Sequence, residues 1–351
     1  MKPVERVYAT LYHEEPDMIP DPRDLAGLGG VIKRETVKSG PNFKIWRSPF
    51  GSIHLDYVNP KTGVSSGVYR HGWVEPENFV WWFTIAPAVR WPEDLERIGR
   101  PSLNYDELRV AKKRADEMHE KGYFVILSHH TPFDTAWRFL RGLKQWLTDI
   151  VRDPSFARRV VEFGIKPQME IANAYIEEAR IDAVYVYGDL GTPEGPFISP
   201  RTYREIIYPW DRRLADSYHK RGAFLFIHSH GYIMPLLDDM IRAGFDAVNP
   251  VSPLCRMDLA EVKERYGDKV TIYADLSIKV PKGGKVDTSE YTSILYGGDV
   301  ERKIEALKYT VRVAAPGGGF IFNRMAKGCT GDQRLYMKAW ERLRRYPITG
   351  A

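Results

Sequence analysis

Two histidines at the end of an apolar run are the clearest candidates for chemistry in this sequence. The run Phe224–Ile227 is followed by His228, Ser229 and His230, with a glycine directly after. If the run is a β-strand, side chains at positions i and i+2 point to the same side, so both imidazoles face one way. Imidazole nitrogen is a common zinc ligand. The pattern favours a metal site, and two histidines that only form hydrogen bonds are the alternative.

A cysteine far along the chain is a candidate for the third metal ligand. The chain has two cysteines, and Cys329 follows the apolar run Gly319–Asn323. With His228 and His230 it would supply three ligands and leave a fourth tetrahedral position for substrate or water. Cys255 is the rival thiolate, and a cysteine without any ligand role is the simpler alternative.

Carboxylates also follow apolar runs. Asp189 and Asp275 each come directly after such a run, and we expect both to be catalytic. Each could complete a metal shell, orient a ligating histidine or act as a general acid, or only cap the following helix. Glu194 is a weaker candidate because it lies in a loop rich in glycine and proline. Of His129 and His130, strand alternation lets only one face inward.

Aromatic residues are candidates for the wall of a substrate pocket. Trp81 and Trp82 are consecutive, so in a strand they face opposite sides, and Phe83 follows them. Tyr187 ends a strand-like run. We expect these four side chains to contact an apolar substrate. Burial in the core is the alternative for most aromatic residues of this region.

The pattern of elements predicts how these residues are positioned. From about residue 120, short β-branched or aromatic runs alternate with amphipathic stretches of helical length, which is typical of βα units and a parallel sheet. Eight strands are expected: near Asp17–Pro20 and Phe79–Ile85, and at Tyr123–Ser128, Ala183–Tyr187, Ala223–His228, Ala247–Val251, Val270–Ala274 and Gly319–Asn323. A chain of this size then fits a closed (β/α)₈ barrel, in which all strands end at the catalytic face.

A different pattern lies near the N-terminus. Residues 30–75 contain three segments that alternate polar and apolar residues around turn residues: Val31–Thr36, Lys44–Ser48 and Ser52–Val58. Such alternation predicts antiparallel strands. We expect one barrel domain over residues 1–351 with this antiparallel β insertion inside it.

Composition narrows the class of protein. The 351 residues are 43% hydrophobic and 28% charged, as in a globular protein, and no apolar run approaches the roughly 20 residues that cross a bilayer. The net charge is +5, from 51 basic and 46 acidic residues, which is too small and too evenly spread for a nucleic-acid-binding surface. We expect a cytoplasmic protein with no nucleic-acid or membrane partner.

Short motifs along nearly the whole chain resemble the uroporphyrinogen decarboxylase superfamily, and within it the cobalamin-dependent methyltransferases. They recur in the order expected for that family: 5–11 with 15–20, 132–136, 188–191, 198–200, 244–247, 266–268 and the glycines at 317–319. The resemblance implies a (β/α)₈ barrel of the uroporphyrinogen decarboxylase type.

Two departures refine what the resemblance implies. The decarboxylases carry paired arginines just after the first strand, and here Asp21–Leu25 takes that place without the pair, which disfavours decarboxylation. The methyltransferases that activate a thiol place His-x-Cys-Gly at the fifth strand and a cysteine after the eighth, and both bind zinc. Here His230 replaces the first cysteine, and Cys329 matches the second. Neutral imidazole leaves zinc a stronger Lewis acid than thiolate does, which suits a poor leaving group.

The resemblance therefore implies a zinc-dependent O-demethylase. It would move a methyl group from a methoxylated aromatic compound to the Co(I) cobalamin of a separate corrinoid protein, with zinc held by His228, His230 and Cys329. One alternative is methyl transfer from a methylated corrinoid protein to a thiol. Another is a barrel that binds a tetrapyrrole without catalysis, or a decarboxylase-like one.

Overall fold

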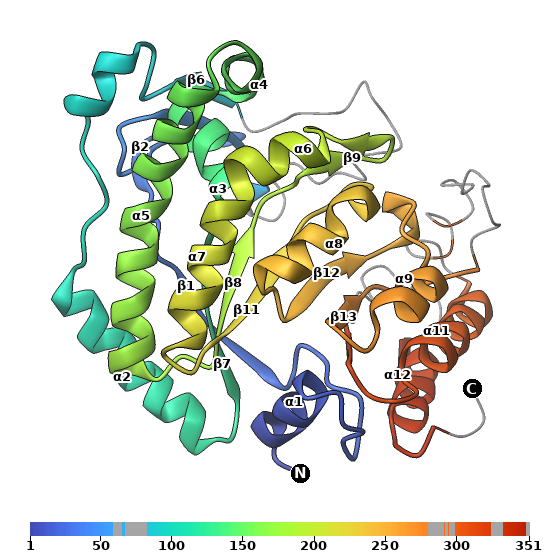
Figure 1. The fold of residues 1–351 in the computed structure, drawn as a ribbon. Helices are drawn as coiled ribbons and strands as arrows, with labels where there is room; N and C mark the ends of the chain where they lie inside the picture. Colours follow the sequence, from blue (N-terminus) through green and yellow to red (C-terminus); the bar gives the residue numbers. More distant parts are fainter. Residues whose placement is uncertain are drawn as a thin grey trace.

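A curled parallel sheet with helices on its outer side forms the body of the protein (Figure 1). The computed structural model describes residues 1–58, 65–66, 83–279, 291, 294, 299–323 and 333–348. The sheet has seven strands in the order β1-β7-β8-β11-β12-β13-β14, and every neighbouring pair is parallel. The strands are β1 (Leu25–Gly30), β7 (Phe124–His130), β8 (Ala183–Tyr187), β11 (Phe224–His228), β12 (Ala247–Val251), β13 (Thr271–Ala274) and β14 (Phe320–Phe322).

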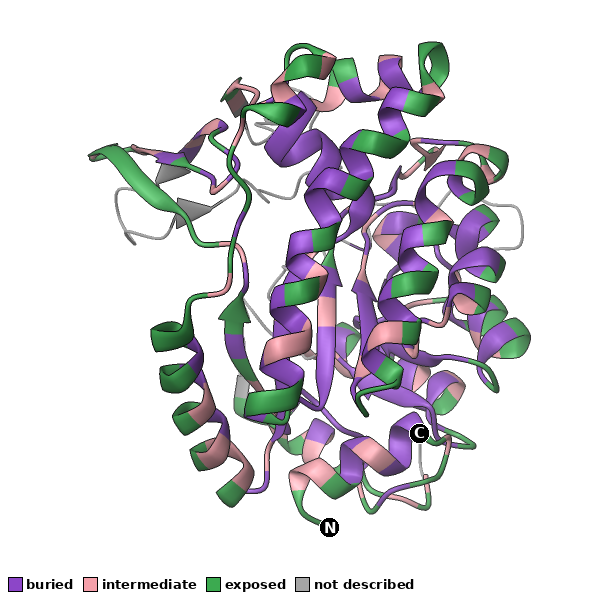
Figure 2. Cartoon of the chain, turned by 60° about the vertical axis from the view of Figure 1, so that its left-hand side comes forward, coloured by how far each residue is buried: buried purple, intermediate pink, exposed green. Residues whose placement is uncertain are grey.

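Amphipathic helices follow the strands and cover the sheet. They turn buried faces toward it and exposed faces toward solvent (Figure 2). Side-chain caps start several of them: Asn104 accepts hydrogen bonds from the first turn of α2, and Asp153 accepts one from the first turn of α5. The helices are α1 (Pro3–Leu11), α2 (Tyr105–Glu120), α3 (Pro132–Thr135), α4 (Leu143–Arg152), α5 (Pro154–Ala179), α6 (Pro200–Thr202), α7 (Tyr208–His219), α8 (Met234–Ala243), α9 (Leu259–Tyr266), α11 (Val300–Ala314) and α12 (Gln333–Leu343). Within the described part of the chain, no helix is both long and apolar enough to cross a membrane.

The concave side of the sheet is apolar below and polar at the carboxyl ends of the strands. Its lower part packs Phe124, Ile126, Phe226 and Ile321 into one buried cluster. Because the sheet is also covered by helices, the six strands after β1 are largely buried on both faces and read as apolar runs, whereas β1 is mostly exposed or half-buried. The polar side chains start where these runs stop, so chemistry is confined to one end of the sheet.

A second, antiparallel sheet lies in the N-terminal part of the chain. Strands β2, β3, β4 and β5 pair in that order, and β6 pairs with β4. Their bounds are β2 (Glu35–Gly40), β3 (Phe43–Arg47), β4 (Ile53–Val58), β5 (Ser65–Ser66) and β6 (Phe83–Ala86). The α/β class with a barrel-type parallel sheet and an antiparallel N-terminal sheet is thus confirmed. The expected strand Val31–Thr36 begins later than predicted, at Glu35.

Two of the eight expected barrel strands are wrong. The segment Asp17–Pro20 is not a strand: Met18 forms one isolated bridge with Arg345, and Asp21 and Asp24 bind buried arginines instead. The first strand of the parallel sheet is β1, which begins at Leu25. The described end of the segment near Phe79–Ile85 belongs to β6 and pairs with β4, so it lies in the antiparallel sheet. The parallel sheet therefore has seven strands among the described residues.

Candidate functional site

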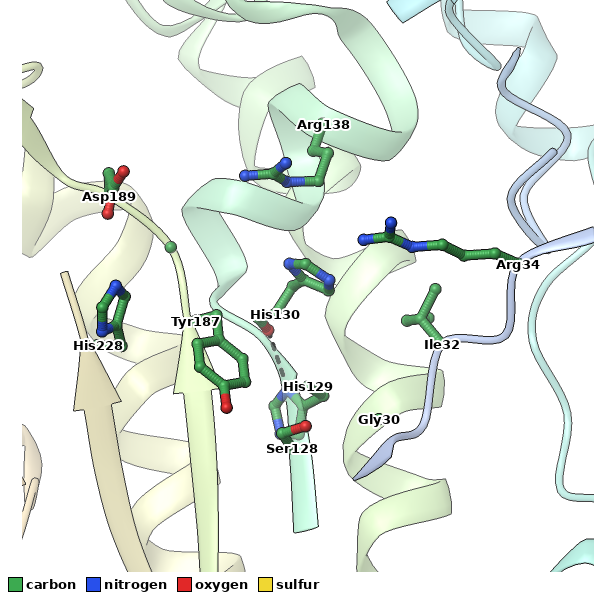
Figure 3. A pocket seen from close by; sticks show the side chains of 11 residues that line it. Gly30, Ile32, Arg34, Ser128, His129, His130, Arg138, Tyr187, Asp189 and His228 are labelled. Carbon is green, nitrogen blue, oxygen red and sulfur yellow. Dashed lines mark hydrogen bonds between the residues drawn. The ribbon is translucent and has the colours of Figure 1, made fainter. Parts of the chain in front are cut away.

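A cavity of about 470 Å³ opens at the carboxyl ends of β7, β8 and β11 (Figure 3). Strand ends and the loop after β1 supply its walls, as expected for a barrel-type sheet. The lining residues are Gly30, Ile32, Arg34, Ser128, His129, His130, Arg138, Tyr187, Gly188, Asp189 and His228. This cavity is the candidate active site.

His228 is the last residue of β11 and lines the cavity, whereas His230 lies two residues beyond the strand, beside His228, and is not among the lining residues. Their ring centroids are 4.9 Å apart. His228 Nδ1 lies 2.6 Å from Asn249 Oδ1, while Asn249 Nδ2 donates to the backbone oxygen of Tyr273, which fixes the orientation of the amide. Because an amide oxygen only accepts hydrogen bonds, the proton is on Nδ1 of His228. Its Nε2 keeps the lone pair that a metal ion requires.

Cys255, the rival thiol, lies beside this pair. Its Sγ is 3.5 Å from His230 Nδ1 and accepts a hydrogen bond from the backbone N–H of Gly231. A sulfur and a nitrogen bound to one tetrahedral zinc ion stand about 3.6 Å apart, from bond lengths near 2.3 and 2.05 Å. Burial lowers the pKa of His230 to about 4 and raises that of the Cys255 thiol to about 12. An S–H···N hydrogen bond fits the same distance, and only a bound cation would favour the thiolate.

The described donors do not by themselves complete a metal site. Among the residues that the structure describes, no three His, Cys, Asp or Glu side chains are grouped closely enough to hold an ion. The predicted ligand Cys329 lies outside those residues. The donor types suit zinc, and the spacing of His230 and Cys255 fits one edge of a tetrahedron.

The predicted carboxylates occupy different positions. Asp189 lines the cavity, and its Oδ1 accepts a hydrogen bond from the backbone N–H of His230. Asp275 is buried and is not among the residues that line the cavity; its Oδ1 accepts a hydrogen bond from Asn323 Nδ2. Burial raises the pKa of Asp275 to about 7, so this carboxyl can hold or release a proton near neutral pH. Glu194 lies exposed in a turn, away from both.

The predicted aromatic residues also differ in whether the structure places them at the cavity. Tyr187 lines the cavity from the end of β8 and is directed toward its interior (Figure 3). Trp81 and Trp82 lie outside the described residues, as does the side chain of Phe83, whose backbone belongs to β6. One aromatic residue of the four is therefore seen at the cavity.

The sequence left open which of His129 and His130 faces inward, and the partners of His130, which are Asp134 and Arg138, were missed. His130 faces the cavity, whereas the His129 ring points the other way and its Nε2 lies 2.7 Å from the hydroxyl of Tyr218. His130 Nδ1 lies 2.7 Å from Asp134 Oδ2, and Arg138 donates to both oxygens of Asp134. Burial opposes ionisation of Asp134, but Arg138 and His130 lower its pKa to about 2. The spacing of Asp134 and Arg138, four residues apart on a helical turn, was the available signal.

Arg34 is the second missed residue, and it corrects a prediction. The segment directly after the first strand is Val31–Arg34, and not Asp21–Leu25, because β1 begins only at Leu25. Arg34 lines the cavity, with its guanidinium 4.4 Å from the ring centroid of Trp46. The absence of paired arginines from Asp21–Leu25 therefore does not count against decarboxylation, because that segment does not follow the first strand.

Comparisons with known proteins agree with this architecture. The structure of a methyltransferase from Methanosarcina mazei is similar, with a TM-score of 0.59 and 16% identity over 97% of this chain and 99% of that one. A B12-independent methionine synthase from Shewanella sp. W3-18-1 is similar with a TM-score of 0.41 and 8% identity, over 70% of this chain and 66% of that one. At 16% identity the likeness to the Methanosarcina mazei structure concerns the fold alone. A search of curated proteins found no match.

A match to a family model supports a stronger conclusion than the likeness to these structures. The model described as uroporphyrinogen decarboxylase matches residues 84–323, which include β7 to β14 and with them all the histidines of the cavity. The chain therefore belongs to the uroporphyrinogen decarboxylase family.

Proposed function

We propose that the protein is a zinc-dependent methyltransferase that moves a methyl group from a methoxylated aromatic compound to the Co(I) cobalamin of a separate corrinoid protein. The observation that carries the proposal is the His228–His230 pair beside the Cys255 thiol at the edge of an open cavity. Nitrogen and sulfur donors suit zinc in catalytic sites. The fold likeness to a methyltransferase supports the reaction class.

The residues of the chain have separate roles in this proposal. His228 and His230 hold the ion with one thiolate, either Cys255, which lies beside His230, or Cys329. A zinc ion held by these residues would supply Lewis-acid chemistry to the ether oxygen. Asn249 keeps the lone pair of His228 on Nε2, and the Asp189 carboxylate fixes the loop through the backbone of His230.

The bond changes explain why acids belong to this site. The ether C–O bond breaks, its electrons stay on the phenolate oxygen, which takes a proton, and the methyl group passes to the Co(I) of the corrinoid protein, which supplies the electron pair of the new bond. Asp189 lines the cavity beside His228 and is the carboxyl nearest to that oxygen in the proposal. Asp275 is buried and is not among the lining residues; because burial raises its pKa to about 7, it can hold or release a proton near neutral pH. Tyr187 contacts the aromatic ring.

A decarboxylase-like reaction is the second candidate. Arg34 and Arg138 line the same cavity, and arginine pairs bind carboxylates well. This candidate needs no metal, whereas the methyltransferase does. The two therefore differ in their response to removal of zinc.

The test compares reactions and metal states in the same protein. Purified protein is assayed with a methoxyarene and free cob(I)alamin, with methylcobalamin and a thiol, and with uroporphyrinogen. We expect methyl transfer from the methoxyarene, with a loss of about 100-fold after chelation and recovery with zinc. His228→Ala should behave like the chelated protein. His119→Gln, on α2 at the opposite end of the sheet, is the matched control.

Three results would contradict the proposal. Full methyl transfer after chelation excludes the Lewis-acid role. Transfer only from methylcobalamin to the thiol reverses the proposed direction. Decarboxylation of uroporphyrinogen that is insensitive to chelation favours the second candidate.

A further inference from the structure

A second cavity lies outside the candidate active site, between the start of α2, the helix α5 and the segment that follows β1 (Figure 1). Its volume is about 290 Å³. Val31 and Ile171, both buried, form part of its apolar wall. Among the described residues, none lines both this cavity and the active-site cavity. The second cavity is therefore a separate candidate site.

The hydroxyl of Tyr175 points to a ligand. This residue of α5 is only 7% exposed and lines the cavity, and no described residue forms a hydrogen bond with its hydroxyl. Burial and the nearby Glu107 carboxylate raise the pKa of Tyr175, so the hydroxyl keeps its proton at neutral pH and can donate. A buried hydroxyl in such a position is normally satisfied by a ligand or by ordered water.

The other polar groups of the second cavity are mostly donors. Asn104 Oδ1 accepts hydrogen bonds from the backbone N–H groups of Asp106 and Glu107, so its Nδ2 is the group left for a ligand. The side chains of Ser102 and Arg100 also line the cavity. An excess of donors favours a ligand that is rich in acceptor oxygens.

The charge of the second cavity is positive. Lys33 and Arg100 are its cations, and Glu107 is its one carboxylate among the described residues. Lys33 Nζ lies 3.3 Å from Glu107 Oε2, so these two charges offset each other. The Arg100 guanidinium lies 4.2 Å from the ring centroid of Phe163, and no described carboxylate pairs with it. A cation–π contact leaves the N–H groups of a guanidinium able to bind an oxyanion.

Alternate residues of the segment that follows β1 line the two cavities. Val31 and Lys33 line the second cavity. Ile32 and Arg34 line the active-site cavity (Figure 3). The backbone N–H of Val31 donates to the oxygen of Ser128 at 2.9 Å, which attaches the segment to β7. An occupant of the second cavity therefore contacts this segment from the side opposite to the active site.

We infer that the second cavity binds a small organic anion through a carboxylate or phosphate group, and that the bound anion stabilises residues 31–34 beside the active site. Arg100 and the Tyr175 hydroxyl contact the anionic group, and Val31 and Ile171 contact the apolar part of the ligand. The inference is independent of the proposed function, because neither the metal ion nor the histidines of the active site take part.

Binding of two anionic probes tests the site. Isothermal titration compares phenyl phosphate and benzoate with the neutral reference benzamide. We expect one of the two anions to bind at least about tenfold more tightly than benzamide, which also distinguishes phosphate from carboxylate. Tyr175→Phe removes only a hydroxyl and Arg100→Gln removes a charge, and each should weaken binding of that anion about tenfold. Arg97→Gln, an exposed residue of the same loop outside the cavity, is the matched control.

Two further measurements give the position and the effect of the bound probe. In crystals soaked with the tighter-binding anion, we expect its density beside Tyr175 and Arg100. Hydrogen exchange at a probe concentration near the wild-type Kd should be slower in residues 31–34 of the wild type, and less affected in Tyr175→Phe. Thermal melting checks that both variants remain folded.

Four results would overturn the binding site. Neither anion binds more tightly than benzamide, both variants bind the anion as tightly as Arg97→Gln does, the density lies only in the active-site cavity, or density appears without a measurable Kd, which means binding at crystal concentration only. Unchanged exchange of residues 31–34 with the probe bound refutes the link to the active site.

Discussion

Asn249 decides which nitrogen of His228 is available to a metal ion. Its Oδ1 lies 2.6 Å from His228 Nδ1, and the Tyr185 hydroxyl donates to the same oxygen. Asn249 is buried, so no water competes easily for this contact. Groups behind a ligating histidine fix the tautomer and the ring orientation, and their loss weakens metal binding.

Replacement of Asn249 should weaken metal binding, although Asn249 itself is not a proposed metal ligand. We expect Asn249→Leu to lower zinc affinity by about 10- to 100-fold, measured by competition with a chromophoric chelator. Asn249→Asp keeps the acceptor oxygen and serves as the control, with affinity at least as high as in the wild type. Equal affinity in the leucine variant would show that His228 is not a ligand through Nε2.

The direction of a functional side chain could be predicted from the sequence only where it follows from the alternation of residues along a strand. His228 is the last residue of β11, so its direction follows from the pleat, whereas His230 lies two residues beyond the strand and its position depends on the loop. Arg34 was missed because its role depends on where the first strand ends. The contact between His230 and Cys255 was not predicted, because it depends on the loop conformation after β12.

Helix α7 carries a buried carboxyl that makes stability depend on pH. Asp211 accepts a hydrogen bond from the Tyr203 hydroxyl on Oδ2, and its Oδ1 has no partner among the described residues. Burial raises the pKa of Asp211 to about 7, against about 3.8 as its ordinary value. Between about pH 4 and 7 the folded protein keeps a proton that the unfolded chain releases, so stability falls as pH rises through this window.

Asp211→Asn should remove this dependence. At about pH 8 we expect the variant to be more stable than the wild type by on the order of 1–3 kcal/mol, and at about pH 4 to show no gain. Urea unfolding at both pH values measures the difference. Asp216→Asn, an exposed carboxyl on the same helix, is the control. A gain of equal size at both pH values would mean that the effect is not ionisation.

Elements with strong periodicity agree best with the sequence prediction. Strands β8, β11 and β12 occupy the predicted runs, and the long helix α5 between β7 and β8 fits the expected alternation of strands with amphipathic helices. The strand expected near Asp17–Pro20 failed because proline cannot donate to a ladder and Asp21 is bound to Arg344. Contacts between segments that are distant in the sequence determine the structure of Asp17–Pro20. The local sequence pattern carries little information about such contacts.

At the scale of the whole molecule, a buried ionic cluster joins the two ends of the chain. Arg344, just after α12, donates to Asp21 and Asp24, and Arg6 of α1 also binds Asp24. All four side chains are almost fully buried. Phe322 of β14 also donates its backbone N–H to the oxygen of Pro20 at 2.9 Å, so the last strand is linked to the chain that leads into β1.

Replacement of Arg344 should destabilise the ionic cluster that joins the two ends of the chain. Arg344→Met leaves carboxylates buried without their partner, and we expect it to lower the free energy of unfolding by about 3–5 kcal/mol. Urea unfolding provides the measurement. Arg345→Met, the exposed neighbour, is the control and should cost less than about 1 kcal/mol. Equal stability of the two variants would show that the cluster does not hold the ends together.

The proposed function requires a zinc ion held by His228 and His230. Zinc-edge X-ray absorption of the purified protein measures both the metal content and its ligands. We expect about one zinc ion per chain, with nitrogen ligands near 2.0 Å and one sulfur near 2.3 Å. In Cys255→Ala and Cys329→Ala proteins, the sulfur should disappear from one of the two. A protein without zinc, or a zinc shell of oxygen ligands alone that is unchanged in His228→Ala, would show that the proposed function is wrong.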